Sequence, residues 1–108
     1  MKSEPTTSLP SDEVAVSLQE HIGMVEIRRP PDNFFDVTLL DAVAEGFGRL
    51  VREPACRAIV LASAGNTFCA GAKFSASGPG GGSARSGSRL YVAALQLFRC
   101  PKPVIAAV

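Results

Sequence analysis

The sequence has few of the side chains that build metal sites or disulfide frameworks. It contains one histidine, His21, and three cysteines, Cys56, Cys69 and Cys100, none of them in a CxxC pair. Zinc sites need clustered cysteine or histidine ligands, and disulfide frameworks need paired cysteines. We therefore expect no metal site, and we interpret the cysteines as buried, reduced thiols.

Long apolar runs are also absent. No stretch approaches the roughly 20 apolar residues that a membrane-spanning helix requires. Residues 1–11 contain two prolines and several serines and threonines without a continuous apolar core, so they do not form a signal peptide. We expect residues 1–12 to be a flexible tail and residues 13–108 to form part of one small cytoplasmic domain with no membrane partner.

Acidic residues are missing from the second half of the chain. All ten lie between Glu4 and Glu53, whereas six basic residues follow Pro54: Arg57, Lys73, Arg85, Arg89, Arg99 and Lys102. The net charge is only +1, and we expect no nucleic-acid partner. Two interpretations stay open: chance on a mixed surface, or a half that faces a polyanion such as the phosphates of a nucleotide cofactor.

The N-terminal half predicts a hairpin followed by a helix. Strands are predicted over residues 14–20 and 24–28, around a turn at residues 21–23 that leaves His21 as an exposed spacer. An amphipathic helix is predicted over residues 37–52, with Asp36 as its N-cap. Gly46 and Gly48 lower the stability of that helix, which suggests that another element packs closely there.

The C-terminal half predicts two continuously apolar strands, residues 57–62 and 104–108, that enclose a helix over residues 89–98. Residues 75–88 are rich in glycine and serine and predict a mobile loop. Apolar strands that are each reached through a helix suggest a parallel sheet covered on its faces. Because the chain stops at the second of these strands, we expect a truncated α/β domain.

Small residues gather where the strand over residues 57–62 ends. Residues 64–74 read Ala-Gly-Asn-Thr-Phe-Cys-Ala-Gly-Ala-Lys-Phe. Tiny side chains let a ligand approach the main chain and leave backbone N–H groups available to bind it. A backbone N–H directed at a thioester oxygen is half of an oxyanion hole.

Five segments occur in the order typical of one family. They are the Arg-Pro-Pro-Asp-Asn turn at residues 29–33, the helix with Leu40 and Ala44, Arg-Ala-Ile-Val-Leu at 57–61, Phe-Cys-Ala-Gly-Ala at 68–72, and Cys-Pro-Lys-Pro-Val-Ile-Ala-Ala-Val at 100–108. Together they resemble the crotonase, or enoyl-CoA hydratase/isomerase, family over residues 14–108. The resemblance implies a crotonase-like ββα spiral, of which this chain would hold the N-terminal part.

The resemblance also implies an acyl-CoA thioester substrate whose carbonyl oxygen is held by two backbone N–H groups. Ala72 matches the residue that supplies the first N–H group. The second donor and the acid–base glutamates would lie beyond Val108, so we expect the chain alone to be inactive. No cofactor is implied apart from the coenzyme A of the substrate, and the full-length protein would be a homotrimer or hexamer.

Family members bind the substrate through residues that match Ala70, Gly71, Ala72, Lys73, Phe74 and Arg29. Lys73 departs from the aspartate that is frequent in the family; it either sits over the CoA phosphates or adenine, or is solvated. Phe74 replaces an aliphatic residue, so packing competes with binding at that position. Arg29 lies near the place where family members have basic contacts to CoA.

Two other functions compete with this one. The glycine-rich residues 78–83 suggest a dinucleotide-binding loop, but Ser83 replaces the last glycine, no strand directly precedes them, and the helix begins late. The glycines of residues 82–88 have P-loop spacing, but no lysine accompanies them. A non-catalytic acyl-CoA-binding or assembly subunit of the same family stays open as the alternative.

Overall fold

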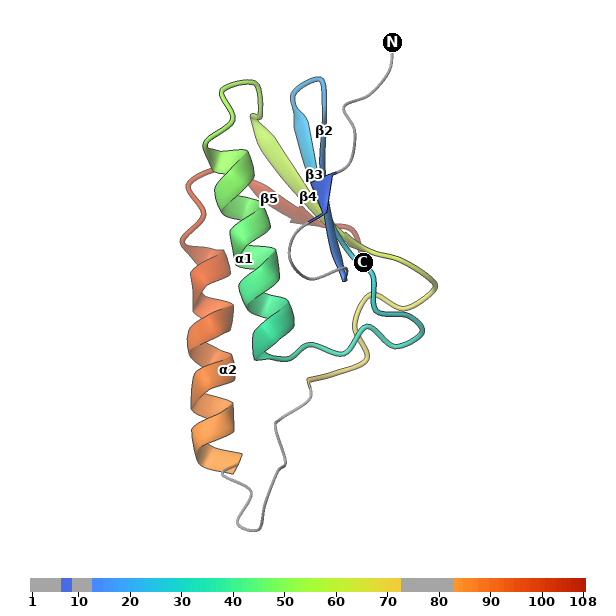
Figure 1. Cartoon of the computed structure of the whole chain (residues 1–108), viewed down its shortest axis with the longest axis vertical. Helices are drawn as coiled ribbons and strands as arrows, with labels where there is room; N and C mark the ends of the chain where they lie inside the picture. Colours follow the sequence, from blue (N-terminus) through green and yellow to red (C-terminus); the bar gives the residue numbers. More distant parts are fainter. Residues whose placement is uncertain (1–6, 9–12, 73–82) are drawn as a thin grey trace.

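The computed structural model describes residues 7–8, 13–72 and 83–108, with side chains for 13–72 and 89–108. The elements are β1 (Thr7–Ser8), β2 (Val14–Gln19), β3 (Ile22–Ile27), α1 (Val37–Val51), β4 (Ala58–Ser63), α2 (Ser83–Phe98) and β5 (Val104–Ala106). Figure 1 shows the two helices side by side on one side of the sheet. The mixed α/β class and the order of the predicted elements are confirmed.

The sheet has five strands in the order β1-β2-β3-β4-β5. The first three are antiparallel, while β3, β4 and β5 run parallel, as expected for strands reached through helices. Thr7 and Ser8 lie in the segment predicted to be a flexible tail, yet they pair with Val16 and Ala15 of β2. Backbone pairing with a sheet edge gives even this short polar segment hydrogen-bond partners.

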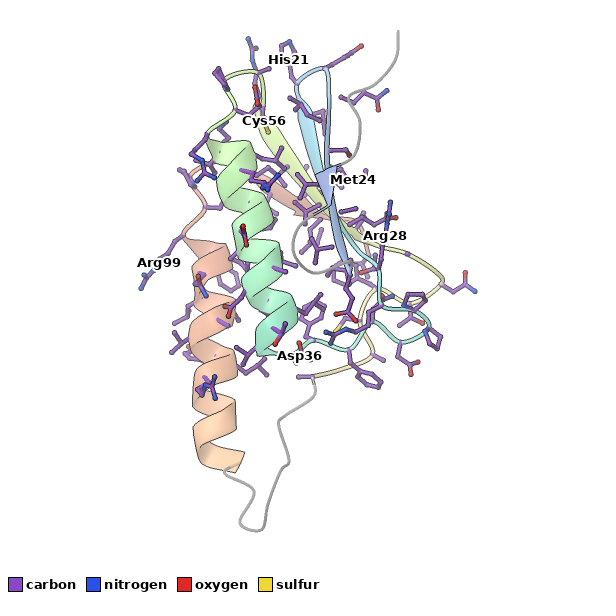
Figure 2. The ribbon with its side chains drawn as sticks, in the orientation of Figure 1. His21, Met24, Arg28, Asp36, Cys56 and Arg99 are labelled. Atoms are coloured by element: carbon purple, nitrogen blue, oxygen red, sulfur yellow. The ribbon has the colours of Figure 1, made fainter. Side chains whose placement is uncertain are left out.

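The hairpin turn lies earlier than the sequence suggested. Glu20 and His21 form it, with Glu20 at a φ of 57°, whereas Ile22 and Gly23 already belong to β3. A Cβ atom at Gly23 would lie 2.6 Å from Leu50 Cδ1, so this glycine permits close strand–helix packing rather than a turn. His21 is exposed, as predicted, and its Nδ1 lies 2.9 Å from the Ala55 carbonyl oxygen (Figure 2).

Helix α1 contributes a buried apolar face to the core, as its apolar spacing predicted. Asp36 caps it, because its Oδ1 accepts a hydrogen bond from the Leu39 N–H at 2.8 Å. Its buried face packs on β2 and β3, while α2 packs against α1. The core cluster unites strand and helix residues: Val14, Val16, Val25, Ile27, Leu39, Ala42, Val43, Phe47, Leu50, Cys56, Ile59 and Leu61.

The two glycines of α1 have different surroundings. A Cβ atom at Gly46 would lie 3.0 Å from Val16 Cγ2 and 3.4 Å from Val25 Cγ2, so the predicted close packing is confirmed there. At Gly48 a Cβ atom would meet only the guanidinium of Arg52, at 3.6 Å. The sequence could not separate the two, because both positions have the same helix propensity.

We therefore expect Gly48→Ala to raise the free energy of unfolding by about 1 kcal/mol, the difference in helix propensity. Gly46→Ala has the same propensity gain, but overpacking against Val16 opposes it. Urea denaturation followed by circular dichroism measures both variants. An equal gain from the two substitutions would contradict the packing difference.

Helix α2 begins earlier than predicted. The sequence suggested a loop over residues 75–88, but residues 83–88 are helical. The low helix propensity of serine and glycine led the sequence-based prediction to begin this helix too late in the chain, at residue 89 rather than 83. The remainder of the predicted loop lies outside the described residues.

In the part of the chain that the structure describes, helices cover one face of the sheet (Figure 1). In β4, Ile59 and Leu61 are buried, while Ala58 and Val60 on the other face are partly exposed. Ile105 of β5 is 61% exposed. The prediction of a sheet covered on both faces is therefore wrong for the described residues, because α1 and α2 lie on the same side (Figure 1).

Candidate functional site

The segment that leaves β4, residues 64–72, contains the predicted site and is called the exit loop below. Gly65 has a φ of 87° and Gly71 a φ of 150°, conformations that residues with a side chain rarely adopt. Ala70 and Ala72 are exposed. The sequence motif of small residues therefore corresponds to an accessible main chain with two backbone positions that favour glycine.

The exit loop is held by a second segment, residues 29–36, called the proline turn below. The Ala70 N–H donates to the Asp32 carbonyl oxygen at 2.9 Å, and the Phe35 N–H donates to the Gly71 carbonyl oxygen at 2.9 Å. Phe35 and Ala72 also form an isolated parallel bridge. Two segments far apart in the sequence thus run side by side at the end of the sheet.

The direction of the Ala72 N–H follows from this bridge. In a bridge between parallel segments, the N–H and C=O groups of one residue point toward the other segment. The N–H and C=O groups of its bridge partner then point away from the first segment. Phe35 bonds to Gly71 in this way, so the Ala72 N–H faces away from the proline turn. Among the residues described, this N–H has no hydrogen-bond acceptor, and Ala72 is exposed.

Asn33 is part of the proline turn, and the sequence analysis predicted no specific role for its side chain. Its side chain is fully buried, and its φ of 51° lies in the left-handed region that asparagine tolerates. Its Nδ2 donates to the carbonyl oxygens of Ala64 at 2.9 Å and Thr67 at 2.6 Å. The available signal was an asparagine directly after Pro-Pro-Asp, a combination typical of a turn.

Arg29, a predicted CoA contact, is partly buried and held by ion pairs. Its guanidinium contacts Glu13 Oε1 at 2.6 Å, Asp36 Oδ2 at 3.0 Å and the Phe34 carbonyl oxygen at 2.9 Å. The hydrogen bond to Glu13 is the largest cause of a raised pKa of Arg29, which burial opposes and Asp36 reinforces. The guanidinium links β2 to the N-terminus of α1, and its contact with CoA stays a prediction.

Of the predicted substrate-binding residues, Ala70, Gly71 and Ala72 lie together in the exit loop. Lys73 and Phe74 lie outside the described residues. The main-chain groups of this stretch are not equally available. The Ala70 N–H is bonded to the proline turn, and the Gly71 carbonyl accepts from both the Phe35 N–H and, at 3.3 Å, the Cys69 Sγ.

The prediction of three buried thiols is confirmed only for Cys56. Cys69 and Cys100 are partly exposed, and all three cysteines are free. Cys69 is exposed in part because it lies in the exit loop, and Cys100 because it follows the end of α2. Neither position is enclosed by the core.

Most of the described basic residues of the second half do not converge on the exit loop. Arg57 and Lys102 precede the parallel strands β4 and β5, so they lie at the end of the sheet opposite to the exit loop. Arg99 follows α2 at that same end and points away from the sheet (Figure 2). Arg89, in the N-terminal half of α2, is left as a candidate to face an anion near the site.

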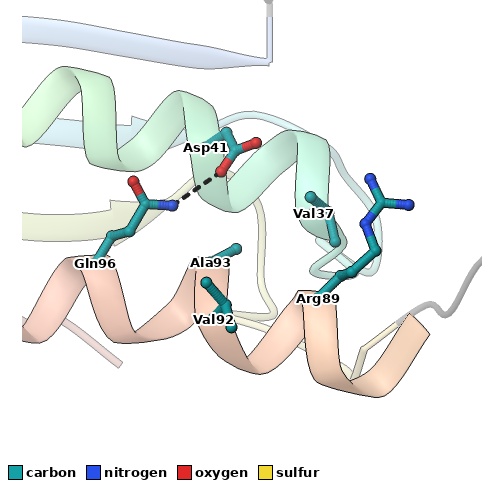
Figure 3. A pocket seen from close by; sticks show the side chains of 6 residues that line it. All are labelled: Val37, Asp41, Arg89, Val92, Ala93 and Gln96. Carbon is teal, nitrogen blue, oxygen red and sulfur yellow. Dashed lines mark hydrogen bonds between the residues drawn. The ribbon is translucent and has the colours of Figure 1, made fainter. Parts of the chain in front are cut away.

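An open pocket of about 370 Å³ lies between α1 and α2 (Figure 3). Apolar and polar side chains line it: Val37, Asp41, Arg89, Val92, Ala93 and Gln96. Gln96 Nε2 donates to Asp41 Oδ1 at 3.1 Å across this pocket. No exit-loop residue of the described part is among the lining residues, so the pocket is separate from the Ala72 N–H.

Metal ligands do not gather within the part of the chain that the structure describes: groups of three or more histidine, cysteine or acidic side chains are absent there. Among these same residues, no helix has the length and apolar character needed to cross a bilayer.

Solved structures define the class of this fold. The chain is similar to Pseudomonas aeruginosa DspI, with a TM-score of 0.77 and 26% identity over 94% of this chain and 43% of that one. An enoyl-CoA hydratase/isomerase family protein from Silicibacter pomeroyi aligns with a TM-score of 0.73 and 26% identity, over 88% of this chain and 42% of the other. The fold is that of the N-terminal part of crotonase-family structures.

The family model for Enoyl-CoA hydratase/isomerase matches residues 17–108, and the chain belongs to this family. It is 33% identical over 101 residues to a Mycobacterium tuberculosis protein named "Probable enoyl-CoA hydratase EchA14", covering 90% of this chain and 39% of that protein. It is 31% identical over 94 residues to the Cavia porcellus "Peroxisomal bifunctional enzyme", covering 84% of this chain and 12% of that enzyme. The chain thus spans well under half of the length of these relatives.

Proposed function

We propose that this chain supplies one half of an acyl-CoA thioester site, with the Ala72 N–H as one of two oxyanion donors. The observation that carries the proposal is the direction of this N–H. It faces away from the proline turn, on an exposed residue, while its neighbours Ala70 and Gly71 are bonded to that turn. The family to which the chain belongs supports a CoA thioester as the substrate class.

The chemistry requires a donor that is already in place. Negative charge develops on the thioester oxygen as an enolate forms, and a fixed N–H stabilises that charge without reorganisation. The geometry of the exit loop supports this role, because backbone hydrogen bonds hold the loop against the proline turn. Coenzyme A enters as part of the substrate, and the proposal needs no further cofactor.

The acid–base carboxylates of the reaction would come from outside residues 54–108, since this stretch contains no acidic residue. We propose hydration or isomerisation of an enoyl-CoA by the whole protein, with the second N–H donor and the acid–base carboxylates supplied elsewhere. The second candidate is a non-catalytic subunit of the same family that binds acyl-CoA or serves assembly. Trimeric or hexameric assembly and a cytoplasmic location stay predictions.

Calorimetric titration of the full gene product with crotonyl-CoA, and with a thioether analogue lacking the carbonyl oxygen, tests the site. We expect the thioester to bind more tightly, because only its oxygen can accept from the Ala72 N–H. Turnover of crotonyl-CoA by the same protein separates the enzyme from the non-catalytic subunit. Equal affinity for the two compounds, or no binding of either, would contradict the proposed site.

A further inference from the structure

We propose that Asn33 is a positioning residue that sets the location of the Ala72 N–H donor. This inference rests on the proposed function, since it concerns the same donor. Asn33 does not face the substrate side; its side chain is fully buried between the proline turn and the exit loop. Its effect on the reaction would therefore pass through the backbone of the exit loop.

The Asn33 amide is fully engaged. Its two N–H bonds go to different carbonyls of the exit loop, those of Ala64 and Thr67, at 2.9 and 2.6 Å. Its Oδ1 accepts from the Arg29 N–H at 2.9 Å, and its own backbone N–H donates to the Arg29 carbonyl oxygen at 2.8 Å. One side chain thus closes the proline turn upon itself and binds that turn to the start of the exit loop.

The position of Asn33 in the proline turn connects these bonds to the donor. Its neighbour Asp32 accepts from the Ala70 N–H, and Phe35, two residues later, donates to the Gly71 carbonyl oxygen. The contacts therefore follow the exit loop from Ala64 to Gly71. If the turn moves relative to Ala64 and Thr67, the bonds next to Ala72 move with it.

A small displacement is enough to matter. Catalytic donors act at hydrogen-bond distance from the developing charge, and a misplacement of about 1 Å can cost on the order of 100-fold in rate. Ser63 adds only one further side-chain bond to the loop, from its Oγ to the Phe68 carbonyl oxygen at 2.7 Å. Among the described residues, Asn33 has a side chain that bonds both to the proline turn and to two exit-loop carbonyls.

Asn33→Asp tests the proposal with almost no change in shape. Aspartate keeps the acceptor for the Arg29 N–H and tolerates the left-handed backbone, but when ionised it places a carboxylate oxygen against two carbonyl oxygens. Asn33→Gly also keeps the backbone conformation and removes all three side-chain bonds. Asn66→Asp is the matched control, because Asn66 is an exposed asparagine in the same exit loop.

Two readouts on the full gene product separate positioning from general stability. The first is amide hydrogen exchange at Ala70 and Phe35, which reports the bonds between loop and turn with no reference to catalysis. The second is the split of kcat and KM with an enoyl-CoA substrate, measured as a function of pH. The carboxyl introduced by Asn33→Asp can donate one hydrogen bond once it is protonated, so the defect of this variant relative to wild type should shrink as the pH falls below the pKa of that carboxyl.

For the Asn33 variants we expect at least roughly tenfold faster exchange at Ala70 and Phe35, and kcat lowered by about 100-fold with KM changed less than about threefold. The Asn66 variant should match wild type in both. Normal exchange, or accelerated exchange with unchanged kcat in a folded variant, would overturn the inference. If Asn33→Asp does not fold, Asn33→Gly provides the test. If the wild-type protein neither binds nor turns over thioesters, the proposed function is wrong. That result is distinct from a loss of activity seen only in the variants.

Discussion

Ala72→Pro is expected to lower the kcat of the full gene product toward an enoyl-CoA by about 10²–10³, the usual effect of removing one oxyanion donor. Proline has no backbone N–H, so the substitution deletes the proposed donor itself. The Ala70 N–H and the Gly71 carbonyl, which bond to the proline turn, are not altered by the substitution. Steady-state kinetics with crotonyl-CoA measures the loss.

Ala72→Gly and Ala72→Ser are the matched controls, because both keep the N–H and alter only the small exposed side chain. We expect kcat within a fewfold of wild type for each. Circular dichroism and hydrogen exchange at Ala70 establish that the proline variant is folded. Near-normal turnover in a folded Ala72→Pro protein would show that another group stabilises the oxyanion.

Lys102→Met is expected to lower the free energy of unfolding by about 2–3 kcal/mol, the scale of losing hydrogen bonds from a charged donor to partly buried carbonyls. The Lys102 Nζ donates to the carbonyl oxygens of Leu50 at 3.0 Å, Glu53 at 3.0 Å and Cys56 at 2.7 Å. This ammonium group binds the C-terminal end of α1 and the turn that leads into β4. A positive charge at this end also complements the helix dipole.

Arg57→Met serves as the control, because it removes an exposed positive charge at the same end of the sheet. Its effect should stay within about 0.5 kcal/mol, as is usual for surface substitutions. Urea denaturation measures both variants. Equal, small effects would mean that the three carbonyls are satisfied by water when the ammonium is absent.

Periodicity and turn chemistry predicted much of the fold. Burial of one face gives a strand or helix a periodic pattern of apolar residues. This pattern is local, and it predicted the strand with Val25 and Ile27 and the helix α1. Asp36 as N-cap is equally local, since it needs only the N–H of Leu39, a near neighbour in the first turn of the helix. The resemblance to the family also indicated Ala72, whose role as a donor stays a prediction.

Other features depended on residues distant in the chain. The role of Gly23 is set by Leu50, and the uncovered face of β5 by the placement of both helices. Propensity cannot predict these outcomes, because tertiary contacts outweigh differences of about 1 kcal/mol per residue.

The candidate site divides in the same way. Its chemistry, an accessible main chain of small residues at the end of β4, was determined by the sequence alone. The direction of the Ala72 N–H was decided by the pairing of Phe35 with the exit loop, two segments separated along the chain by α1 and β4. The buried Asn33 and the ion pairs of Arg29 likewise emerged only in three dimensions, because a hydrogen bond or an ion pair between distant segments leaves no periodic trace in sequence.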